Sequence, residues 1–226
     1  MLELRLGSVA IVDYEAGNLF SVEHACKAVG LTPTITSKPE DILQSDALIL
    51  PGVGAFGDAM KNLHKLDLIL PLREFAASRK PFMGICLGMQ LLFSRSEEFG
   101  AHEGLNIIEG DVVKFPLINE YGEINRIPQI GWNQITYPTE FGGKWQDTPL
   151  EQITNGEFMY FIHSFYVKPR NSENVLAVTE YGGLNYCSAV NKENIFATQF
   201  HPEKSAVEGM KIYRYWANKI ISNKEN

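Results

Sequence analysis

Before Gly100, the hydrophobic and polar positions of the chain alternate between two periods. Short runs rich in β-branched and other apolar residues predict buried strands, and apolar residues spaced three and four apart predict helices. We expect strands at residues 8–14, 32–36 and 47–50, and helices at 17–30, 58–65 and 68–78. This alternation is typical of right-handed βαβ units, in which helices cover both faces of a parallel sheet.

After Gly100 the pattern changes to short apolar runs separated by Gly, Pro, Asn and Asp. The runs are LNIIEGDVVKFP, IGWNQITYP, FMYFIHSFYVKP, VLAVTEY, NYCSAV and IFATQF. They predict antiparallel or mixed strands, and a last helix is expected at 207–221. No linker, repeat or low-complexity segment interrupts the chain, so we expect residues 1–226 to form a single α/β domain. Its predicted architecture has three layers: an open, mixed and mainly parallel sheet with helices on both faces.

One segment, PFMGICLGMQLLF at residues 81–93, combines strand, turn and helix patterns. Its Gly-Ile-Cys-Leu-Gly turn has the form of a nucleophile elbow, with cysteine in the place of serine. Glycine tolerates the strained backbone and close packing of such a turn. The thiol of Cys86 would then lie at the start of a helix, where free N–H groups stabilise a thiolate. The alternative is a buried structural cysteine after a core strand.

The glycine-rich segment after the strand at 47–50, PGVGAFG, has several interpretations. Gly52 to Gly57 matches the G-x-G-x-x-G pattern of dinucleotide sites, but it follows the third predicted strand. The acidic residue nearest the expected offset, Glu74, lies inside a predicted helix. A better functional interpretation is that the Gly52–Val53 backbone supplies N–H groups for an oxyanion, as acyl transfer requires. A plain glycine turn between a strand and a helix is the other possibility.

A cysteine nucleophile needs a general base, and His201 is the candidate among the five histidines. It ends the run IFATQF and is followed by Pro202, which disfavours an immediate helix. Residues i and i+2 of an extended segment project to the same side. We therefore expect Glu203 to hold the His201 ring while the other ring nitrogen faces the thiol, as in a catalytic triad. The alternative is an exposed loop. His163 is expected to be a core histidine with its hydrogen bonds satisfied.

Composition narrows the class of protein. Lys and Arg number 20 against 27 Asp and Glu, a net charge of -7, and no basic cluster indicates a nucleic-acid partner. Three cysteines without C-x-x-C spacing argue against a disulfide framework or a zinc site, and they favour a reducing compartment. No apolar run reaches the ~18 residues of a membrane span, and no secretory leader is evident. We expect a soluble cytoplasmic protein without metal, cofactor or membrane partner.

Taken together, PGVG, GICLGMQ and HPEKS resemble the motifs of the class I, or triad, glutamine amidotransferases, which hydrolyse glutamine to release ammonia. A finer resemblance is to the glutaminase subunits of imidazole glycerol phosphate synthase, of histidine biosynthesis. DYEAGNLFSVEHACKAVG, GLNIIEGDVVKFP, PQIGWNQI and YFIHSFYV carry it, and it covers nearly the whole chain. The resemblance implies glutamine as substrate, no cofactor, and a heterodimer with a (β/α)8-barrel cyclase subunit that receives the ammonia and makes imidazole glycerol phosphate and AICAR.

The resemblance also implies roles for individual residues. Cys86 would be the nucleophile, His201 the general base and acid, and Glu203 its orienting partner. The oxyanion would meet the N–H of Leu87 and the Gly52–Val53 peptide. Glutamine would be bound by Gln90, Glu98, Ser164 and Phe165, with Glu98 on the α-ammonium group. The synthase partner would contact Asn18, Trp132, Asn133, Tyr160 and Lys204.

Two residues depart from the pattern of those subunits. Glu15 stands where glycine is usual in DYGxGN, and Gln129 stands where histidine is common before IGWN. Both lie in motifs associated with the partner, so the same glutaminase chemistry serving a different synthase, such as one that aminates a surface-sugar precursor, is the alternative. A catalytically inactive binding subunit is a further alternative, against which the intact Cys86, His201 and Glu203 argue.

Overall fold

The computed structural model describes residues 7–138 and 145–222. Its main feature is an 11-stranded sheet in the order β2-β1-β3-β4-β13-β12-β10-β7-β5-β6, with β11 beside β12. The part from β2 to β13 is parallel. These strands are β2 (Thr32–Thr36), β1 (Ser8–Val12), β3 (Ala47–Gly52), β4 (Phe82–Cys86) and β13 (Ile195–Thr198). Their near-continuous apolar sequence is what burial on both faces of a parallel sheet requires.

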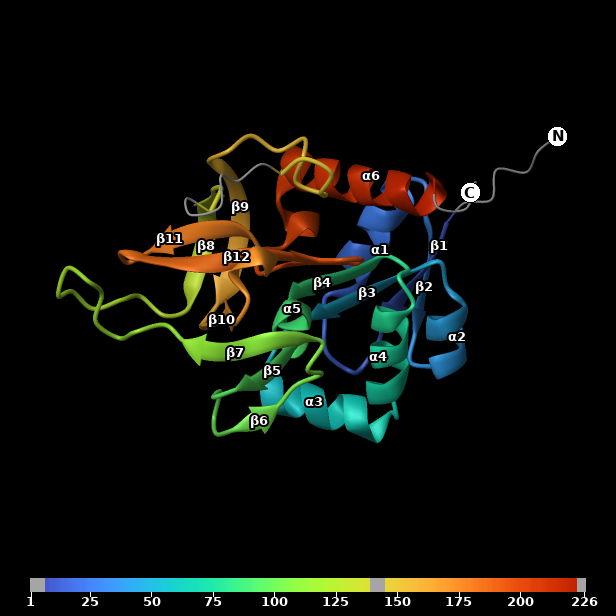
Figure 1. The fold of residues 1–226 in the computed structure, drawn as a ribbon, viewed down its shortest axis with the longest axis horizontal. Coiled ribbons are helices and arrows are strands. Elements are labelled where there is room, and N and C mark those ends of the chain that lie inside the picture. The colour runs from blue at the N-terminus through green and yellow to red at the C-terminus, as the bar shows by residue number, and fades with distance from the viewer. Residues whose placement is uncertain (1–6, 139–144, 223–226) are drawn as a thin grey trace.

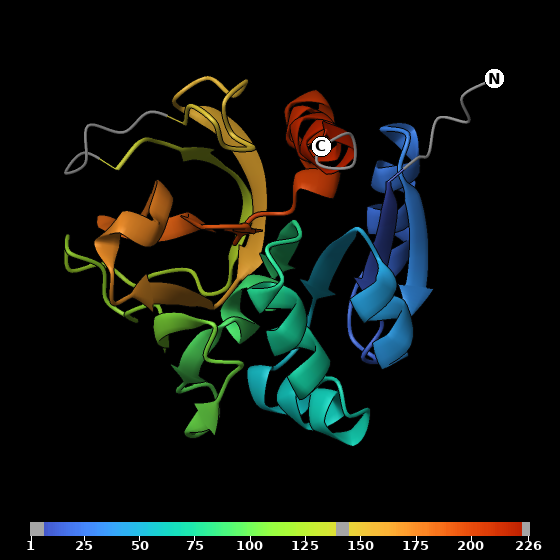
Figure 2. The ribbon, with the colours of Figure 1, turned by 45° about the vertical axis from the view of Figure 1, so that its right-hand side comes forward.

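The rest of the sheet is mostly antiparallel. It contains β12 (Leu184–Lys192), β11 (Val175–Tyr181), β10 (Phe165–Pro169), β7 (Ile108–Lys114), β5 (Phe93–Ser96) and β6 (His102–Glu103), with only β5 and β7 parallel to each other. A separate two-stranded antiparallel sheet pairs β8 (Gln129–Ile135) with β9 (Glu157–His163). In Figure 2 this strand-rich half, green to orange, lies beside the parallel half.

Helices cover both faces of the parallel part (Figure 1). On one side lie α1 (Leu19–Ala28) and α6 (Ala206–Ser222), and on the other lie α2 (Pro39–Gln44), α3 (Phe56–Lys65) and α4 (Ile69–Ala77). Alternate residues of each strand serve the two cores. Val9 and Ile11 of β1 join the α1/α6 core, and Ala10 and Val12 join the other. Full burial of each large aliphatic side chain stabilises the fold by about 1.5–3 kcal/mol.

The predicted three-layer α/β fold is confirmed, and the predicted helices and strands before residue 80 are all present. Three details were wrong or missing. The helix after Cys86, α5 (Leu87–Leu91), is short, and Phe93 already begins β5. The run FMYFIHSFYVKP contains two strands, β9 and β10, which break at Ser164 because they pair with different sheets. Helix α2 was not predicted, because only Ile42 of its residues is buried.

The topology brings distant segments to one edge of the sheet. Strand β4 lies between β3 and β13 and is parallel to both, so their carboxyl ends meet at the same edge. These ends lead into Gly52, Cys86 and the segment Gln199–His201. Ligand sites of open α/β sheets are usually found at this edge. None of the described helices is long and apolar enough to cross a membrane.

Candidate active site

The predicted elbow is present at the end of β4. Cys86 has φ 55° and ψ −110°, a backbone conformation that non-glycine residues rarely adopt. The helix that follows presses against β3, since a Cβ atom on Gly88 would lie 1.7 Å from the carbonyl oxygen of Leu50. Only glycine fits at that position. The thiol of Cys86 is therefore held at the turn by backbone geometry, with the first N–H groups of α5 free of intrahelical partners.

His201 and Glu203 form a buried pair beside this turn. Nδ1 of His201 lies 2.8 Å from Oε1 of Glu203, and the two side chains are only 2% and 1% exposed. The segment is fixed by the His201 N–H, which donates to the carbonyl of Tyr160 at 2.9 Å. The predicted i, i+2 pairing is thus seen, although Pro202–Lys204 forms one turn of 3-10 helix and is not extended.

The electrostatics of His201 couple it to Cys86. Burial lowers the pKa of His201, but the negative charge of the Cys86 thiolate and the Glu203 carboxylate outweigh burial and raise that pKa to about 10. Among the described residues, Nε2 of His201 has no well-aligned hydrogen-bond partner. Catalytic hydrogen bonds are often loose before substrate binds. Because Nδ1 is engaged by Glu203, Nε2 is the ring nitrogen left for the thiol.

A cavity of about 290 Å³ opens at Cys86. It is lined by the residues predicted to bind glutamine or the oxyanion, namely Val53, Leu87, Gln90, Glu98, Ser164 and Phe165. Gly52 lies behind Val53, where its Cα pairs with that of Cys86 in the sheet register. One oxygen of Glu98 accepts the N–H of Phe56, at 2.6 Å, at the start of α3. Gly54, Pro128, Ile162 and His163 complete the lining and were not among the predicted site residues.

His163 is a structural histidine, as the sequence suggested. Its Nδ1 lies 2.8 Å from the Phe165 carbonyl and its Nε2 lies 3.2 Å from the Tyr186 hydroxyl, so both ring nitrogens have partners. Burial lowers the pKa of His163 to about 4. A neutral ring must donate from Nδ1, because a carbonyl oxygen only accepts. This histidine thus holds the Phe165 carbonyl at the cavity wall.

The residues predicted to meet a partner divide into two groups. Trp132 and Tyr160 pair across β8 and β9 with their rings 6.0 Å apart, and the Lys204 ammonium lies 6.0 Å from the centre of the Tyr160 ring. Asn133 points to the opposite side of β8 and donates to the carbonyl of Glu180. Asn18 precedes α1, and the neighbouring Gly17 lies close to Pro51 and Gly52.

The outer side of the β8–β9 sheet is unusually apolar. Ile130, Trp132, Phe158 and Ile162 are 60%, 53%, 48% and 39% exposed, and with Tyr160 they alternate along the two strands on one face. We call these five residues the outer apolar face. Contiguous exposed apolar surfaces of this kind mark sites of protein association.

The two departures from the family pattern have local explanations. Glu15 adopts φ 65°, a left-handed conformation that suits glycine, and forms an exposed ion pair with Lys65 at 3.1 Å. Gln129 is only 3% exposed, and its side-chain amide lies 3.0 Å from the Tyr186 hydroxyl oxygen. Its side chain therefore lies behind the β8–β9 sheet and not on its outer face.

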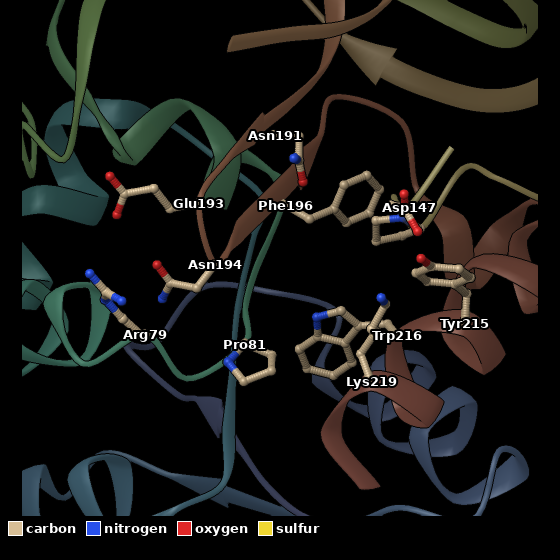
Figure 3. Close-up of a pocket in the computed structure, with 11 residues that line it drawn as sticks. Arg79, Pro81, Asp147, Asn191, Glu193, Asn194, Phe196, Tyr215, Trp216 and Lys219 are labelled. Carbon is tan, nitrogen blue, oxygen red and sulfur yellow. The ribbon is translucent and has the colours of Figure 1, made fainter. Parts of the chain in front are cut away.

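A cavity of about 590 Å³, larger than that at Cys86, lies at the other end of the parallel strands (Figure 3). Pro81 and Asn194 line it, and these residues immediately precede β4 and β13. In Figure 3, Asp147, Tyr215 and Lys219 lie on the side of the cavity opposite Arg79. None of the predicted site residues borders it. Nor does the described part of the chain hold a cluster of three His, Cys, Asp or Glu side chains fit for a metal ion.

This fold, with a cysteine elbow beside a buried His–Glu pair, is that of the glutamine amidotransferase class-I family, whose sequence model matches residues 10–219. The chain belongs to that family. It is 46% identical over 207 residues to "Imidazole glycerol phosphate synthase subunit HisH 1" of Legionella pneumophila (strain Paris), covering 92% of this chain and 97% of the relative. It is 42% identical over 213 residues to subunit HisH of Geobacter metallireducens, covering 94% and 98%. Within the class, the chain therefore belongs among the HisH sequences.

Solved structures agree on the fold. A crystal structure described as glutamine amidotransferase superposes with a TM-score of 0.68 at 19% identity, covering 94% of this chain and 98% of that one. The structure of PurLQS from Thermotoga maritima gives a TM-score of 0.66 at 19% identity, covering 98% and 100%. At these identities the likeness concerns the fold alone.

Proposed function

We propose that this chain is the glutaminase subunit of an imidazole glycerol phosphate synthase, acting in the cytoplasm as a single domain in a heterodimer. The observation that carries the proposal is the cavity in which Cys86, on a strained elbow, opens beside the buried His201–Glu203 pair. Nucleophile, base and orienting carboxylate are the parts that amide hydrolysis through a covalent intermediate needs. Sequence identity to HisH subunits supports histidine biosynthesis as the setting.

In the first half of the proposed reaction, the Cys86 sulfur attacks the side-chain amide carbon of glutamine. The carbonyl electrons move to oxygen, and the N–H of Leu87 and the Gly52–Val53 peptide stabilise the resulting oxyanion. His201 donates its proton to the amide nitrogen, the carbon–nitrogen bond breaks, and ammonia leaves. The raised pKa of His201, about 10, supports this step because the ring holds a proton to give while the thiolate attacks.

In the second half, His201 takes a proton from water, whose oxygen attacks the γ-glutamyl thioester. The carbon–sulfur bond breaks, glutamate leaves, and the Cys86 thiolate and protonated His201 are restored. Glu203 keeps the ring in place through both halves, since it bonds to Nδ1 and leaves Nε2 for the chemistry. Loss of one oxyanion donor typically costs about 3 kcal/mol of barrier, so a shift of the Gly52–Val53 peptide would act as a switch.

The partner is proposed to be a (β/α)8-barrel cyclase that covers the outer apolar face. Three features support this surface: its exposed apolar residues, the Trp132–Tyr160–Lys204 cluster, and its continuity with the cavity, which Ile162 also lines. Ammonia released at Cys86 would then emerge beneath the bound partner. Asn18 and Asn133, which do not belong to that face, are proposed as further contacts of the partner. If the partner were a different synthase, it too would need an apolar surface complementary to the outer apolar face.

The experiment compares Cys86→Ala with Cys26→Ala in the complex with the cyclase subunit. Cys26 is buried in the α1/α6 core, which makes it a matched control for the substitution. We expect Cys86→Ala to abolish glutamine-dependent synthesis and spare synthesis from added ammonia, whereas Cys26→Ala spares both. Loss of both activities in a folded Cys86→Ala complex would contradict the proposal. So would full glutamine turnover by that variant.

A further inference from the structure

The side chain of Gln199 contacts the Cys86 sulfur but has no role in the proposed reaction steps. Gln199 is fully buried and stands two residues before His201. Its Nε2 lies 3.7 Å from the Cys86 sulfur, and its Oε1 lies 3.0 Å from Nε2 of Gln90. Nε2 of Gln90 also donates to the Phe165 carbonyl at 2.9 Å. Three buried groups are thus joined in a line that ends at the nucleophile.

The direction of every hydrogen bond in this line is fixed by its far end. A backbone carbonyl can only accept, so the Gln90 atom that faces Phe165 must be the amide nitrogen. That nitrogen has a second hydrogen, and the Gln199 atom in front of it must be oxygen. The other end of the Gln199 amide is therefore nitrogen, and it turns an N–H toward the Cys86 sulfur. His163 holds the Phe165 carbonyl from the other side, at 2.8 Å.

We propose that Gln199 is a positioning residue for Cys86, whose side-chain amide donates a hydrogen bond to the thiolate in an orientation set by Gln90 and the Phe165 carbonyl. The proposal rests on the proposed function for its significance, since a stabilised, aimed thiolate is what attack on glutamine requires. A donor favours the charged sulfur over the neutral thiol. Gln90 then has two roles. Its amide nitrogen orients Gln199, and its side chain also lines the cavity proposed to bind glutamine.

The test measures alkylation of Cys86 by iodoacetamide at neutral pH, followed by mass spectrometry of the peptide that contains it. Gln199→Glu preserves shape but places a carboxylate oxygen at the sulfur. We expect its alkylation rate to fall roughly ten-fold, because hydrogen bonds to charged groups are among the stronger ones. The half-maximal pH of the reaction should also rise. Gln152→Glu, at an exposed position, makes the same charge change away from the site and should react at the wild-type rate.

Gln199→Met removes the donor without adding charge, and it serves if the buried carboxylate prevents folding. We expect slower alkylation here too. A merely structural role predicts the opposite sign, because loosened packing would expose Cys86 and speed its alkylation. Unchanged or faster alkylation in Gln199→Met would overturn the inference. Alkylation by iodoacetamide does not depend on glutamine. If the wild-type protein in complex with its cyclase failed to hydrolyse glutamine, the proposed function would be rejected, but the alkylation result for Gln199 would still stand.

Discussion

The close approach of β3 to the elbow makes a sharp prediction for Gly52→Ala. A Cβ atom at Gly52 would lie 2.2 Å from the Tyr14 hydroxyl oxygen and 2.9 Å from Cβ of Leu87. Tyr14 has no room to withdraw, since it is 0% exposed and donates to the Pro51 carbonyl at 2.6 Å. The substitution must therefore displace both the phenol and the start of α5.

Two costs add up for this variant. Breaking the hydrogen bond of Tyr14 leaves buried polar groups unpaired, which costs about 1–3 kcal/mol. Overpacking against Leu87 costs about 1–3 kcal/mol more. We expect the free energy of unfolding to fall by ~2–6 kcal/mol. Glutaminase activity should fall as well, because the Gly52–Val53 peptide moves with the displaced turn.

A double-mutant cycle with Tyr14→Phe measures the shared part of the cost. Tyr14→Phe alone removes the hydroxyl that the new methyl group would meet, at a cost of about 1 kcal/mol for the lost hydrogen bond. Urea unfolding should show the double variant to be at least ~1 kcal/mol more stable than the sum of the single effects predicts. If the two effects add to within ~0.5 kcal/mol, the phenol is not what excludes a side chain at Gly52.

Two further predictions concern the same edge of the sheet. Gly88→Ala should destabilise the protein by ~3 kcal/mol or more in urea unfolding, because its Cβ would lie 1.7 Å from a rigid backbone oxygen of Leu50; a loss below ~1 kcal/mol would show that the elbow can shift. The pKa of His201 is raised in the fold from 6.5 to about 10, so its contribution to stability is present below pH 6.5 and is lost as the pH rises through about 10. We expect the free energy of unfolding to fall less over this pH range in Cys86→Ala than in the wild-type protein, because the variant lacks the thiolate. An identical fall in the two proteins would contradict the electrostatic coupling of His201 to Cys86.

Local sequence patterns predicted the fold well where one strand or helix is a separate apolar run. The parallel strands and most of the helices that cover them were found because each carries its own periodicity. Where two elements share one run, pattern alone failed: nothing local at Ser164 says that β9 pairs with β8 while β10 pairs with β7 and β12. That break is decided by tertiary pairing.

The catalytic residues could be predicted where a short sequence motif by itself determines the local backbone conformation. The glycines around Cys86 and the spacing of His201 and Glu203 pointed to the elbow and the buried pair from the sequence alone. Gln199 was missed, although it stands two residues before His201 and so was a candidate for the same side of the chain. Its relevance depends on the direction of its amide, which contacts with Gln90 and Phe165 fix across the fold.

Strand β9 links the outer apolar face to the reacting groups without an intervening layer. The side chain of Ile162 lies on that face, while its carbonyl lies 3.9 Å from the Cys86 sulfur. Two residues earlier, Tyr160 also belongs to the face, and its carbonyl accepts the N–H of His201. A protein bound to the outer apolar face would therefore press on the strand whose backbone touches both nucleophile and base. We predict that a displacement of β9 would shift the two carbonyls that contact Cys86 and His201, so docking on the outer apolar face would be coupled to catalysis through the backbone of β9.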